Sequence, residues 1–481
     1  MATNKTFYIT TPIYYPNAKL HMGHAYTTVI CDILARARRL QGDEVYFLTG
    51  SDENTEKVVR AAKEAGEETG EYLNNIIQNF RELFARLEIT NDQFIRTSDQ
   101  KKHWPGVVEI WKRMEKAGDI EKRAYQGLYC VGHESFVTEK DLVDGKCPDH
   151  NEEPQVLKEE NYFFKLSKYT ERIKEKIKSG ELEIIPEGRK NEILALLEKG
   201  LEDVSFSRSA EKMSVGIPVP GDPSQKIYVW GDALTNYISA LGFGRDDILY
   251  QKFWPANVQV LGKDILRFHA AIWPGMLLSA GVPLPKKLLV HGFITSGGKK
   301  MSKSLGNVID PNYLIEEYGA EAVRYYLTRH ISPFEDGDLT LESFKEIYNA
   351  NLANGLGNLV SRVMKMAQDN IEKLKEEKIE ILGKTEISKE FFEYLEKFEI
   401  NKACDYIWKE IGEMDKFIQE NQPFRIVKTE KEKGQKMISD LVVRLYSVAR
   451  MLNPILPETS VKIKELIKQN KTPEKPLFAR K

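Results

Sequence analysis

Cysteine is scarce in this chain of 481 residues, which contains only four. Four scattered thiols do not make the disulfide framework of a small secreted domain, and their scarcity favours a reducing compartment. The sequence also lacks an apolar signal core, an Arg- and Ser-rich transit segment and any apolar run of about 18 residues. We therefore expect a cytoplasmic protein that does not enter a membrane.

A net charge of one sign is missing as well. The chain has 70 basic and 72 acidic residues, which give a formal charge of -2, whereas nucleic-acid binding is easiest to recognise from a strongly basic balance. Any basic surface that binds nucleic acid must therefore be confined to one part of the chain.

An apolar content of 41% excludes a disordered composition, and at about 150 residues per domain the length predicts roughly three domains.

The first part of the chain alternates strand-like and helical patterns. Residues 7–10 and 44–48 are apolar runs typical of buried strands, and residues 23–40 have the periodicity of an amphipathic helix. This order predicts an α/β fold with a doubly wound parallel sheet. The alternation breaks near residue 113, and strand-like runs resume at 227–230, 258–261 and 287–294. We therefore expect the sheet to be split by an insertion.

Helical patterns dominate after about residue 345. They cover residues 344–369, 388–419 and 436–452 and predict a helical bundle. Two charged stretches, 373–378 and 428–434, are typical of solvated helix faces or loops. We expect the last residues to form an extended C-terminal appendix.

The first chemical signal is His21-Met22-Gly23-His24, at a predicted strand-to-helix junction. Backbone N–H groups at a helix N-terminus attract phosphate, and Gly23 has no Cβ to keep a nucleotide away from the backbone. His21 and His24 are three residues apart, so both rings can project from one side of the first turn and donate to phosphate oxygens. The alternative is a pair of histidines that caps the helix and binds no ligand.

The second signal is KMSKS at residues 300–304, after an apolar run and the pair Gly297-Gly298. Lys300 and Lys303, on a glycine-hinged loop, can close over a triphosphate and neutralise the departing pyrophosphate. A solvated basic turn is the alternative. The two signals lie on opposite sides of the insertion, and together they favour a catalytic nucleotide site.

These two strings carry a resemblance to a known family. HMGH is similar to the HIGH signature of class I aminoacyl-tRNA synthetases, and KMSKS is the second signature of that class. Further segments resemble methionyl-tRNA synthetases in the family's order, namely TTPIYYPNAKLHMGH, FLTGSDENTEK, NYFFKLSKY, IPVPGDPSQKIYVWGDALTNY, GKDILRFHAAIWPGML and NANLANGLGNLVSR. The resemblance covers roughly residues 7 to 465. It implies activation of L-methionine with ATP to methionyl-adenylate and pyrophosphate, followed by transfer of methionine to the 3' end of tRNA(Met).

The same resemblance assigns a role to each part of the chain. The implied segments are the first half of the catalytic Rossmann fold (1–112), a connective-peptide insertion with a zinc knuckle (113–225), the second half of the catalytic fold (226–298), the KMSKS loop and stem-contact region (299–345), a helical anticodon-binding domain (346–465) and the appendix (466–481). The implied ATP site comprises His21, Gly23, His24, Lys300, Ser302 and Lys303, with Mg²⁺ accompanying ATP. The two histidines and two lysines would act by positioning and charge stabilisation.

The implied methionine site is rich in aromatic and aliphatic side chains. A thioether favours contact with aromatic edges. By resemblance the site comprises Ile13, Tyr15, Asp52, Trp230, Ala233, Leu234, Tyr237, Asp264, Ile265 and His269. Asp52 would bind the substrate ammonium, and Asp264 with Arg208 resembles an acidic–basic pair beneath the site. For each of these the alternative is an ordinary core residue.

Two departures from the family's pattern concern the edge of that pocket. Asn54-Thr55 stand where the family usually has His-Gly, and Gly231 follows Trp230 where a larger residue is usual. Both departures can reshape the outer contacts of the substrate.

A Cys/His cluster lies inside the predicted insertion. Cys130-x2-His133 and, thirteen residues later, Cys147-x2-His150 give two closely spaced ligand pairs. Two such pairs suit a closed, tetrahedral, structural Zn²⁺ site. The family more often has Cys where His133 stands, and some members have lost the metal, so a metal-free knuckle is the alternative.

The helical region carries the expected anticodon contacts. Asn358 and Arg362 are four apart, so they share a helix face and can bond base edges. They match the family's anticodon-reading positions, and Phe424 stands where the family has a stacking Trp. The alternative is an ordinary helix surface with a core Phe. The implied partner is tRNA(Met), both initiator and elongator.

Other functions stay open at this point. A sister class I synthetase for leucine, isoleucine or valine would carry an editing domain for which this chain has no room, and a cysteine enzyme would place zinc in its amino-acid pocket. A small nucleotidyltransferase would lack the KMSKS loop in this form. A non-enzymatic alternative is an inactive paralogue that serves as an RNA-binding module. Because the chain ends before the family's C-terminal dimerisation module, we expect a monomer.

Overall fold

The computed structural model describes residues 5–481 apart from 131–134, 138, 140–141, 149–150, 302–305 and 373–386. The chain divides into two compact units, each assembled from segments that are far apart in the sequence. The first unit contains residues 1–19, 44–82 and 91–290, and the second contains residues 20–43, 83–90 and 291–481. No helix within the described ranges is long and apolar enough to cross a membrane.

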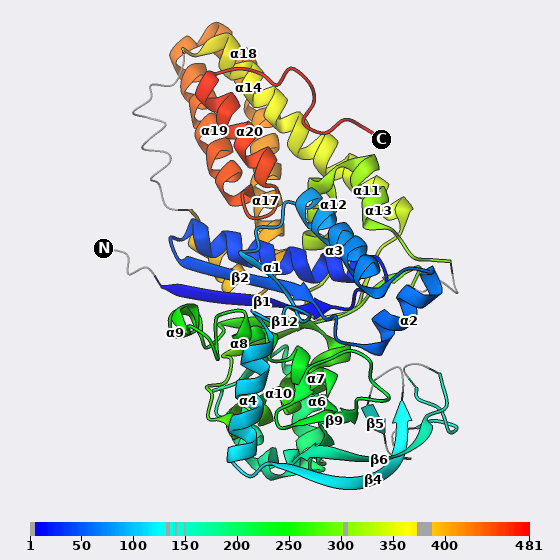
Figure 1. Ribbon diagram of the computed structural model, residues 1–481. Helices are drawn as coiled ribbons and strands as arrows, with labels where there is room; N and C mark the ends of the chain where they lie inside the picture. Colours follow the sequence, from blue (N-terminus) through cyan, green and yellow to red (C-terminus); the bar gives the residue numbers. More distant parts are fainter. Residues whose placement is uncertain are drawn as a thin grey trace. The chain divides into compact units, whose positions relative to one another are not determined.

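The first unit is organised around a six-stranded sheet (Figure 1). Its strands, in spatial order, are β3 (Gln93–Arg96), β2 (Glu44–Ser51), β1 (Thr6–Tyr14), β12 (Val258–Gly262), β13 (Lys287–His291) and β7 (Glu183–Ile185). β1 pairs in parallel with both β2 and β12, with Thr10 opposite Leu48 and Gln259. These three strands are almost entirely buried, as is typical of parallel sheets. The expected α/β fold with a split parallel sheet is confirmed.

The middle of the first unit is antiparallel. One sheet has the order β5 (Ser135–Val137), β4 (Ile120–Cys130), β6 (Gln155–Phe164) and β8 (Val204–Ser205). A second sheet has the order β10 (Pro218–Val219), β11 (Asp222–Ile227) and β9 (Ser207–Ser209). In the sequence, α5 (Thr170–Lys178), the edge strand β7 and α6 (Glu187–Glu198) lie between β6 and β8. The predicted insertion therefore also contributes one strand to the main sheet.

One large apolar core joins these parts of the first unit. Trp111 of α4 (Trp104–Lys116), Phe164, Tyr237 and Trp273 of α10 (Trp273–Ala280) are among its fully buried members. Replacing any one of them by alanine would cost about 3–5 kcal/mol in the free energy of unfolding. Further helices of this unit include α2 (Glu56–Ala65), most of α3 (Thr69–Arg86) and α9 (Ile248–Phe253).

The expected strand at 227–230 is wrong. β11 ends at Ile227, and the helix α7 (Val229–Ala233) begins two residues later, followed by α8 (Asn236–Ser239). An apolar run of four residues has no periodicity that distinguishes a strand from a buried helical turn. Trp230 therefore projects from a helix.

The second unit is mainly helical (Figure 1). It contains α1 (Met22–Leu40), α11 (Pro311–Tyr318), α12 (Ala320–Arg329), α13 (Leu341–Ile347), α14 (Asn358–Asn370), α16 (Lys389–Glu396), α17 (Ile400–Asn421), α18 (Pro423–Thr429), α19 (Lys431–Leu452) and α20 (Pro457–Gln469). α14, α17, α19 and α20 lie side by side, which confirms the expected helical bundle. A small sheet completes the unit, with the order β15 (Lys299–Lys300), β14 (Ile294–Ser296) and β16 (Gly337–Asp338).

Two of the expected long helices are divided. The pattern at 344–369 consists of α13, a π-helix at Tyr348–Gly357 and α14. The pattern at 388–419 breaks at Phe398, whose φ is 60°. The charged stretch 428–434 is mostly exposed and opens α19, whereas 373–378 lies outside the described residues.

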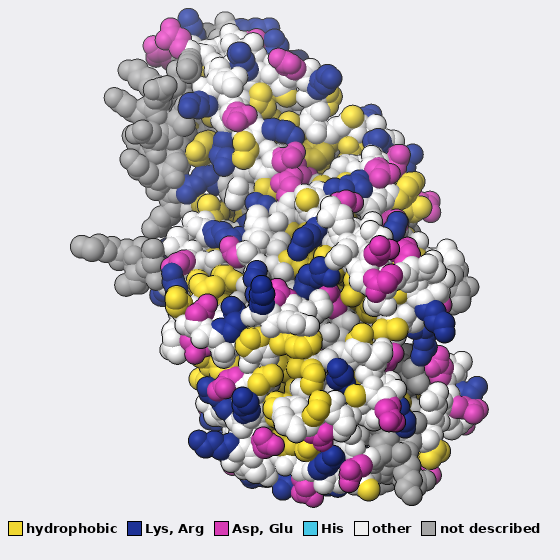
Figure 2. Space-filling model, viewed as in Figure 1, with side chains coloured by type: hydrophobic (Ala, Val, Ile, Leu, Met, Phe, Trp, Pro, Cys, Tyr) yellow, Lys and Arg dark blue, Asp and Glu magenta, His cyan; other side chains and the backbone are white. Residues whose placement is uncertain are grey.

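The last residues form an extended segment that packs on the π-helix of the second unit. The backbone carbonyls of Ala479 and Lys481 accept hydrogen bonds from Tyr348 Oη (2.8 Å) and Asn349 Nδ2 (2.9 Å). Arg480 Nε donates to Asn354 Oδ1 at 2.7 Å. On the face in Figure 2, basic and acidic side chains are interspersed, in keeping with the net charge of -2.

Candidate active site

The carboxyl ends of β1 and β2 carry several residues predicted for the amino-acid site, within the first unit. The pairing of the two strands shifts by one residue between Thr10 and Ile13 and then continues to their ends, with Ile13 opposite Gly50 and Tyr14 opposite Ser51. Asp52 follows directly, and its backbone N–H donates to the carbonyl of Tyr14 at 2.9 Å. The sheet runs outward in opposite directions from β1 and β12, and ligands of open α/β sheets bind outside such a point.

Gly50 is required by close packing at this place. A Cβ on Gly50 would lie 2.2 Å from the carbonyl oxygen of Ile95 and 2.9 Å from Cγ2 of Ile13. The predicted pocket residue Ile13 therefore rests directly on the backbone of β2. Tyr15 is half-buried beyond the strand, with the ammonium of Lys57 at 4.5 Å from its ring centroid.

Aromatic side chains from two pairs of short helices pack together in one layer, the aromatic wall, which contains several residues predicted to bind methionine. Trp230, on α7, stacks on Phe268 with centroids 3.7 Å apart and an interplanar angle of 11°. Tyr237, on α8, bonds through its hydroxyl to Nε2 of His269 at 2.7 Å. His269 lies on a π-helix (Phe268–Ile272) after a 3-10 turn (Lys263–Ile265). Four of the predicted residues are thereby brought into one cluster, Trp230, Tyr237, Ile265 and His269.

The His269 ring is held neutral. Burial lowers its pKa to about 4, against an opposing hydrogen bond with the carbonyl of Ile265 at 3.0 Å. With Nδ1–H donating to that carbonyl, Nε2 is left to accept the hydroxyl proton of Tyr237. The pair is therefore a fixed dipole and not a charge, which suits an apolar substrate side chain.

Other predicted methionine-site residues differ in exposure. Ala233 and Leu234 are buried in the segment that carries Trp230. The indole N–H of Trp230 is buried with no acceptor among the described residues, which leaves one donor for a ligand. Arg208 is buried and donates from Nη1 to Ser205 Oγ at 2.9 Å, whereas Asp264 is exposed.

The histidines of HMGH, in the second unit, cap their own helix. His21 is the N-cap of α1, and its Nδ1 accepts from the backbone N–H of Gly23 at 3.1 Å. His24 Nδ1 accepts in return from the backbone N–H of His21 at 3.2 Å. The ring centroids are 3.8 Å apart. The capping alternative raised by the sequence is thus present.

Capping determines the tautomer of both rings. Because each Nδ1 is an acceptor, a neutral ring carries its proton on Nε2, where it is a hydrogen-bond donor. Burial, with a smaller contribution from His21, lowers the pKa of His24 well below its ordinary value of 6.5. His24 is therefore a neutral donor at the N-terminus of a helix, where the helix dipole also attracts anions.

A hairpin presents the first lysine of KMSKS. Thr295 and Ser296 of β14 pair with Lys300 and Lys299 of β15 across the turn at Gly297-Gly298. Both glycines have positive φ (62° and 73°), as a tight hairpin turn requires. Lys300 is exposed, whereas Ser302 and Lys303 lie outside the described residues.

An aspartate holds this hairpin at its turn. Asp338 Oδ1 accepts from the backbone N–H of Gly298 (2.8 Å) and from Thr295 Oγ1 (2.7 Å). These bonds, the one from Gly298 first, lower the pKa of Asp338. The hairpin is therefore tied to β16 by an ionised side chain.

The hairpin and α1 are joined within the second unit. His291, which precedes β14, bonds through Nε2 to Thr27 Oγ1 at 2.7 Å. Thr27 is one turn along α1 from Gly23, whose carbonyl accepts from the same hydroxyl at 3.0 Å. Two hydrogen bonds thus connect the first turn of α1 to the residue that precedes the hairpin strand β14.

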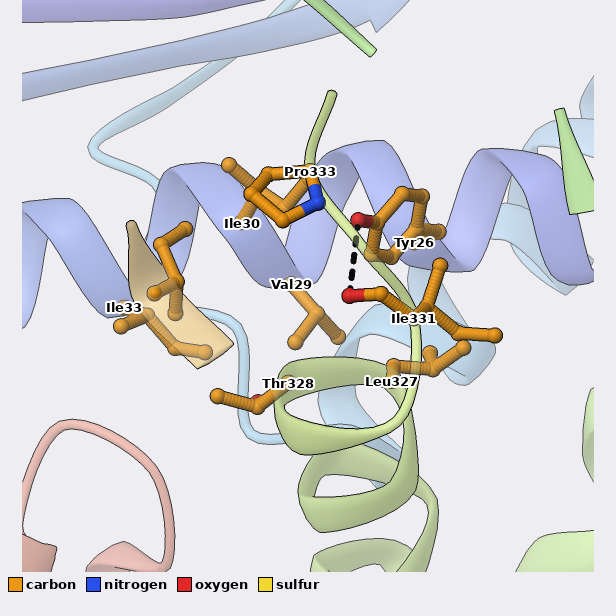
Figure 3. Close-up of a pocket in the computed structure, with 9 residues that line it drawn as sticks. Tyr26, Val29, Ile30, Ile33, Leu327, Thr328, Ile331 and Pro333 are labelled. Carbon is orange, nitrogen blue, oxygen red and sulfur yellow. Dashed lines mark hydrogen bonds between the residues drawn. The ribbon is translucent and has the colours of Figure 1, made fainter. Parts of the chain in front are cut away.

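A small pocket lies beside α1 in the second unit (Figure 3). Its lining is apolar except for two hydroxyls and consists of Tyr26, Val29, Ile30, Ile33, Leu327, Thr328, Ile331, Pro333 and Ile400. Figure 3 shows the Tyr26 hydroxyl directed at the carbonyl of Ile331. With no charged group in its lining, this pocket is not suited to phosphate.

The predicted anticodon residues lie on helices of the second unit. Asn358 is exposed at the start of α14. Arg362, one turn later, forms an ion pair with Asp415 of α17. Phe424 is 41% exposed near the start of α18, with the Arg425 guanidinium 5.9 Å from its ring centroid. Phe424 is therefore not a core residue.

The expected zinc cluster falls partly outside the described residues, because His133 and His150 are not among them. Cys130 ends β4, Cys147 follows a short β-bridge, and both thiols are buried. A turn closes at Cys147, whose carbonyl accepts from the backbone N–H of Asn151 at 2.7 Å. The described residues alone contain no group of three or more side chains that could hold a metal ion.

Several buried polar residues near the aromatic wall have no motif to reveal them. His103 and Asp232 are fully buried and bonded to each other, yet they are separated by more than a hundred positions. Asp232 belongs to the family-like segment VWGDA, which was the only available signal. Asn54, noted as a departure from the family's pattern, bonds to the same aspartate at 2.8 Å.

Comparison with known proteins places these observations in a family. The profile described as "tRNA synthetases class I (M)" matches residues 7–156 and 150–364. The chain is 45% identical to the methionine–tRNA ligase of Clostridium acetobutylicum over 480 residues, which span 96% of this chain and 73% of that protein. The methionine–tRNA ligase of Thermotoga maritima is 39% identical, over 98% of this chain and 76% of that protein.

Solved structures agree with the sequence comparison. The chain is similar to Mycobacterium tuberculosis methionyl-tRNA synthetase in complex with methionyl-adenylate, with a TM-score of 0.88, 36% identity and coverage of 96% of this chain and 94% of that one. The apo form of the M. tuberculosis enzyme gives a TM-score of 0.83 and 32% identity, with 99% of this chain and 98% of that one covered.

Proposed function

This chain belongs to the methionine–tRNA ligases of the class I tRNA synthetases, and from that premise we propose how its residues perform the reaction. The chain activates L-methionine with ATP and charges tRNA. In the first step a methionine carboxylate oxygen attacks the α-phosphorus of ATP, the bond to the β-phosphate oxygen breaks, and pyrophosphate leaves. In the second step a ribose hydroxyl of the terminal nucleotide attacks the adenylate carbonyl and AMP leaves.

The α1 N-terminus would stabilise the charge that develops on phosphate. His21 and His24 each present an Nε2–H donor, because their Nδ1 atoms are engaged by the backbone. Lys300 and Lys303 would neutralise the leaving pyrophosphate, and Mg²⁺ bound with ATP would add further positive charge. Gly23, where a Cβ would lie 2.9 Å from His21 Cε1, keeps the approach to the backbone open. No side chain needs to transfer a proton in the first step.

The first unit would hold methionine. Asp52, at the carboxyl end of β2, would pair with the substrate ammonium. The Trp230–Phe268 stack and the neutral Tyr237–His269 pair would surround the thioether, with Ile13 at the base. The buried indole N–H of Trp230 supports a ligand at this place, because it has no acceptor among the described residues.

The observation that carries the proposal is the reciprocal capping of the two HMGH histidines, which engages both Nδ1 atoms with the backbone and so places the proton of a neutral ring on Nε2. Amino-acid-dependent ATP–pyrophosphate exchange with all twenty amino acids tests it. Only methionine should support exchange. Exchange with leucine, isoleucine, valine or cysteine would identify a sister enzyme, and no exchange at all would indicate an inactive paralogue.

The KMSKS lysines allow a sharper test of the same proposal. Lys303→Ala should cut adenylate formation by roughly 10²–10³, the usual effect of removing one transition-state contact, with methionine affinity near that of the parent. Lys299→Ala, beside Lys300 on the same hairpin, is the matched control. Parental exchange in Lys303→Ala would overturn the assigned role.

The helical unit would read the anticodon. Asn358 and Arg362 lie one turn apart on α14, and Phe424 presents an exposed ring on which an unstacked base can stack. Phe424→Ala should raise the KM for tRNA(Met) with pyrophosphate exchange unchanged. Val461, on α20, has a similarly exposed apolar side chain, so Val461→Ala serves as the control.

The two cysteines of the Cys/His cluster support a structural zinc site. Two buried thiols, Cys130 and Cys147, fit a structural Zn²⁺ that His133 and His150 would complete. Purified protein should then contain about one zinc per chain, and Cys147→Ser should lose it.

A monomer in the cytoplasm is the proposed state, which size-exclusion chromatography with light scattering and cell fractionation would test.

A further inference from the structure

A buried polar network links the two parts of the proposed methionine site, and it involves His103, Asp232 and Asn54. None of the three belongs to the set of residues expected to touch substrate. All three are at least 96% buried within the first unit. A buried carboxylate is stable only when its oxygens are bonded, so the partners of Asp232 indicate what the network holds in place.

The pocket wall itself is locally weak. α7 has five residues and α8 has four, and together they carry Trp230, Ala233 and Tyr237. Helices this short have few internal hydrogen bonds and depend on tertiary contacts for their position. Something outside the segment must therefore determine where its aromatic side chains lie.

His103 clamps both short helices. It precedes α4, and its Nε2 lies 2.6 Å from Oδ1 of Asp232 on α7. Its Nδ1 lies 2.7 Å from the hydroxyl of Ser239, at the end of α8. α4 and α8 approach closely, since a Cβ on Gly106 would lie 2.7 Å from Cβ of Ser239.

Asn54 extends the clamp to the loop of Asp52. Its amide nitrogen donates both hydrogens, one to Oδ2 of Asp232 at 2.8 Å and one to the carbonyl of Thr97 at 2.9 Å. Glu53 is held to the same residue, because its backbone N–H donates to Thr97 Oγ1 at 2.7 Å. The carboxylate proposed to bind the substrate ammonium lies two positions before Asn54.

We propose that His103, Asp232 and Asn54 are positioning residues for methionine, which hold the aromatic wall and the Asp52 loop in the geometry that fits the amino acid. The inference rests on the proposed function of this site. It also accounts for the departure at position 54, where an amide supplies the two donors that Asp232 and Thr97 require. The network does not touch the reacting atoms.

Steady-state pyrophosphate exchange separates this role from simple stabilisation. Asp232→Asn removes the charge and leaves a single side-chain oxygen, so the side chain can no longer present one acceptor oxygen to Asn54 and another to His103. The KM for methionine should rise roughly tenfold or more, the equivalent of one lost buried hydrogen bond to a charged group, with the KM for ATP within about twofold of the parent.

Asp119→Asn is the matched control. Asp119 also has a fully buried side chain in the first unit, bonded to Ser279 Oγ (2.7 Å), Lys168 Nζ (2.7 Å) and the Tyr169 hydroxyl, but it contacts no proposed site residue. Asp119→Asn should lower thermal stability and leave both KM values unchanged when rates are divided by titrated active sites. Equal KM values for methionine in the two variants would overturn the inference.

A pair of substitutions at position 103 gives a second test that does not depend on Asp232→Asn folding. His103→Gln keeps an N–H donor within reach of Asp232 and should stay within roughly threefold of the parental KM for methionine, whereas His103→Leu should match Asp232→Asn. If Gln and Leu give the same KM, the inference is wrong. A parent without methionine-dependent exchange would instead refute the proposed function and leave this comparison without a substrate.

Discussion

His269 illustrates how burial determines the chemistry of a single side chain. Its pKa falls to about 4 because the ring is buried, so the native protein holds it neutral where the unfolded chain would protonate it. A group whose pKa is lowered on folding binds fewer protons in the native state. Its contribution to stability is complete above about pH 6.5, the usual pKa of histidine, and is lost as the pH falls towards 4.

This linkage predicts a measurable pH dependence. Between pH 6.5 and pH 5, where most carboxylates stay ionised, protonation of His269 in the unfolded chain should reduce the free energy of unfolding by roughly 1.5 kcal/mol. His269→Gln should therefore lose about that much less than the parent over the same range in urea titrations. Parallel curves for the two proteins would show that His269 does not titrate on unfolding.

A second prediction at this scale separates the two roles of His24. His24→Asn can still accept the backbone N–H of His21 through its side-chain oxygen, but it has lost the Nε2 donor. His24→Ala loses both. Each variant should reduce adenylate formation by about 10²–10³, whereas only alanine should also lose about 1 kcal/mol of stability through the missing cap.

The comparison that matters is between these two variants. Rapid-quench measurement of adenylate formation, together with urea unfolding, gives both quantities on the same samples. Full activity in His24→Asn would show that capping is the only function of the ring.

Residues that belong to a short sequence motif could be predicted from the sequence. Residues that meet only because the fold buries them together could not. HMGH places two imidazoles one turn apart, because helix geometry relates positions that differ by three. The bond between His103 and Asp232 depends on the fold of the whole first unit. In the sequence Asn54 was noticeable only as a departure from the family's pattern. The structure shows that its amide donates a hydrogen bond to Asp232.

At the scale of elements, a buried ion pair binds α1 to the rest of the second unit. Arg324 of α12 is fully buried and contacts Asp32 of α1 at 2.8 Å. The guanidinium also donates to the carbonyls of Leu87 (3.0 Å), Pro454 (2.7 Å) and Ile455 (2.9 Å). One side chain thereby joins three chain segments.

The aspartate of this pair is equally well satisfied. Burial alone raises the pKa of Asp32, but Arg324 and Arg36 with bonds from Thr90 outweigh it and hold the pKa below its ordinary value. Thr90 donates from its backbone N–H at 2.8 Å and from its hydroxyl at 2.6 Å. Neither partner can be removed without leaving a buried charge.

We predict a large loss of stability when the pair is broken. Arg324→Met should cost about 3–5 kcal/mol in urea unfolding, because it strands the Asp32 carboxylate and three carbonyls. Asp32→Asn should cost a similar amount. The double variant should lose less than the sum of the two, and a strictly additive cycle would contradict a direct interaction. Arg450→Met, on α19, is a control substitution of the same type.

Element boundaries were predicted well where periodicity is strong and poorly where it is absent. The amphipathic pattern at 23–40 matches α1 within one residue, since nineteen residues give five turns of signal. β7 has three residues inside a polar stretch and is defined only by its pairing with β13. Nothing local distinguishes such a strand from a loop.

At the scale of the whole chain, the sequence order and the packing order differ. Reading along the sequence separates a catalytic half from a helical half near residue 345. The second compact unit instead takes residues 20–43 and 83–90 together with 291–481, so the helix that begins with HMGH packs with the helical part of the chain. The assignment of α1 to the second unit depends on contacts such as the ion pair between Asp32 and Arg324. No local sequence pattern reveals such a contact.

The discontinuous second unit leads to a prediction for a fragment of residues 291–481. Without α1, the fragment lacks Asp32, Leu87 and the apolar side chains of Val29 and Ile33 that line the pocket beside α12. It should unfold at lower urea concentration and with a broader transition than the full chain. In the fragment, Arg324→Met should cost less than in the full chain, because the Asp32 carboxylate and the Leu87 carbonyl are absent and only the carbonyls of Pro454 and Ile455 remain as partners. Should the fragment unfold as cooperatively as the full chain, with Arg324→Met still costing several kcal/mol, α1 would not be an integral part of that unit.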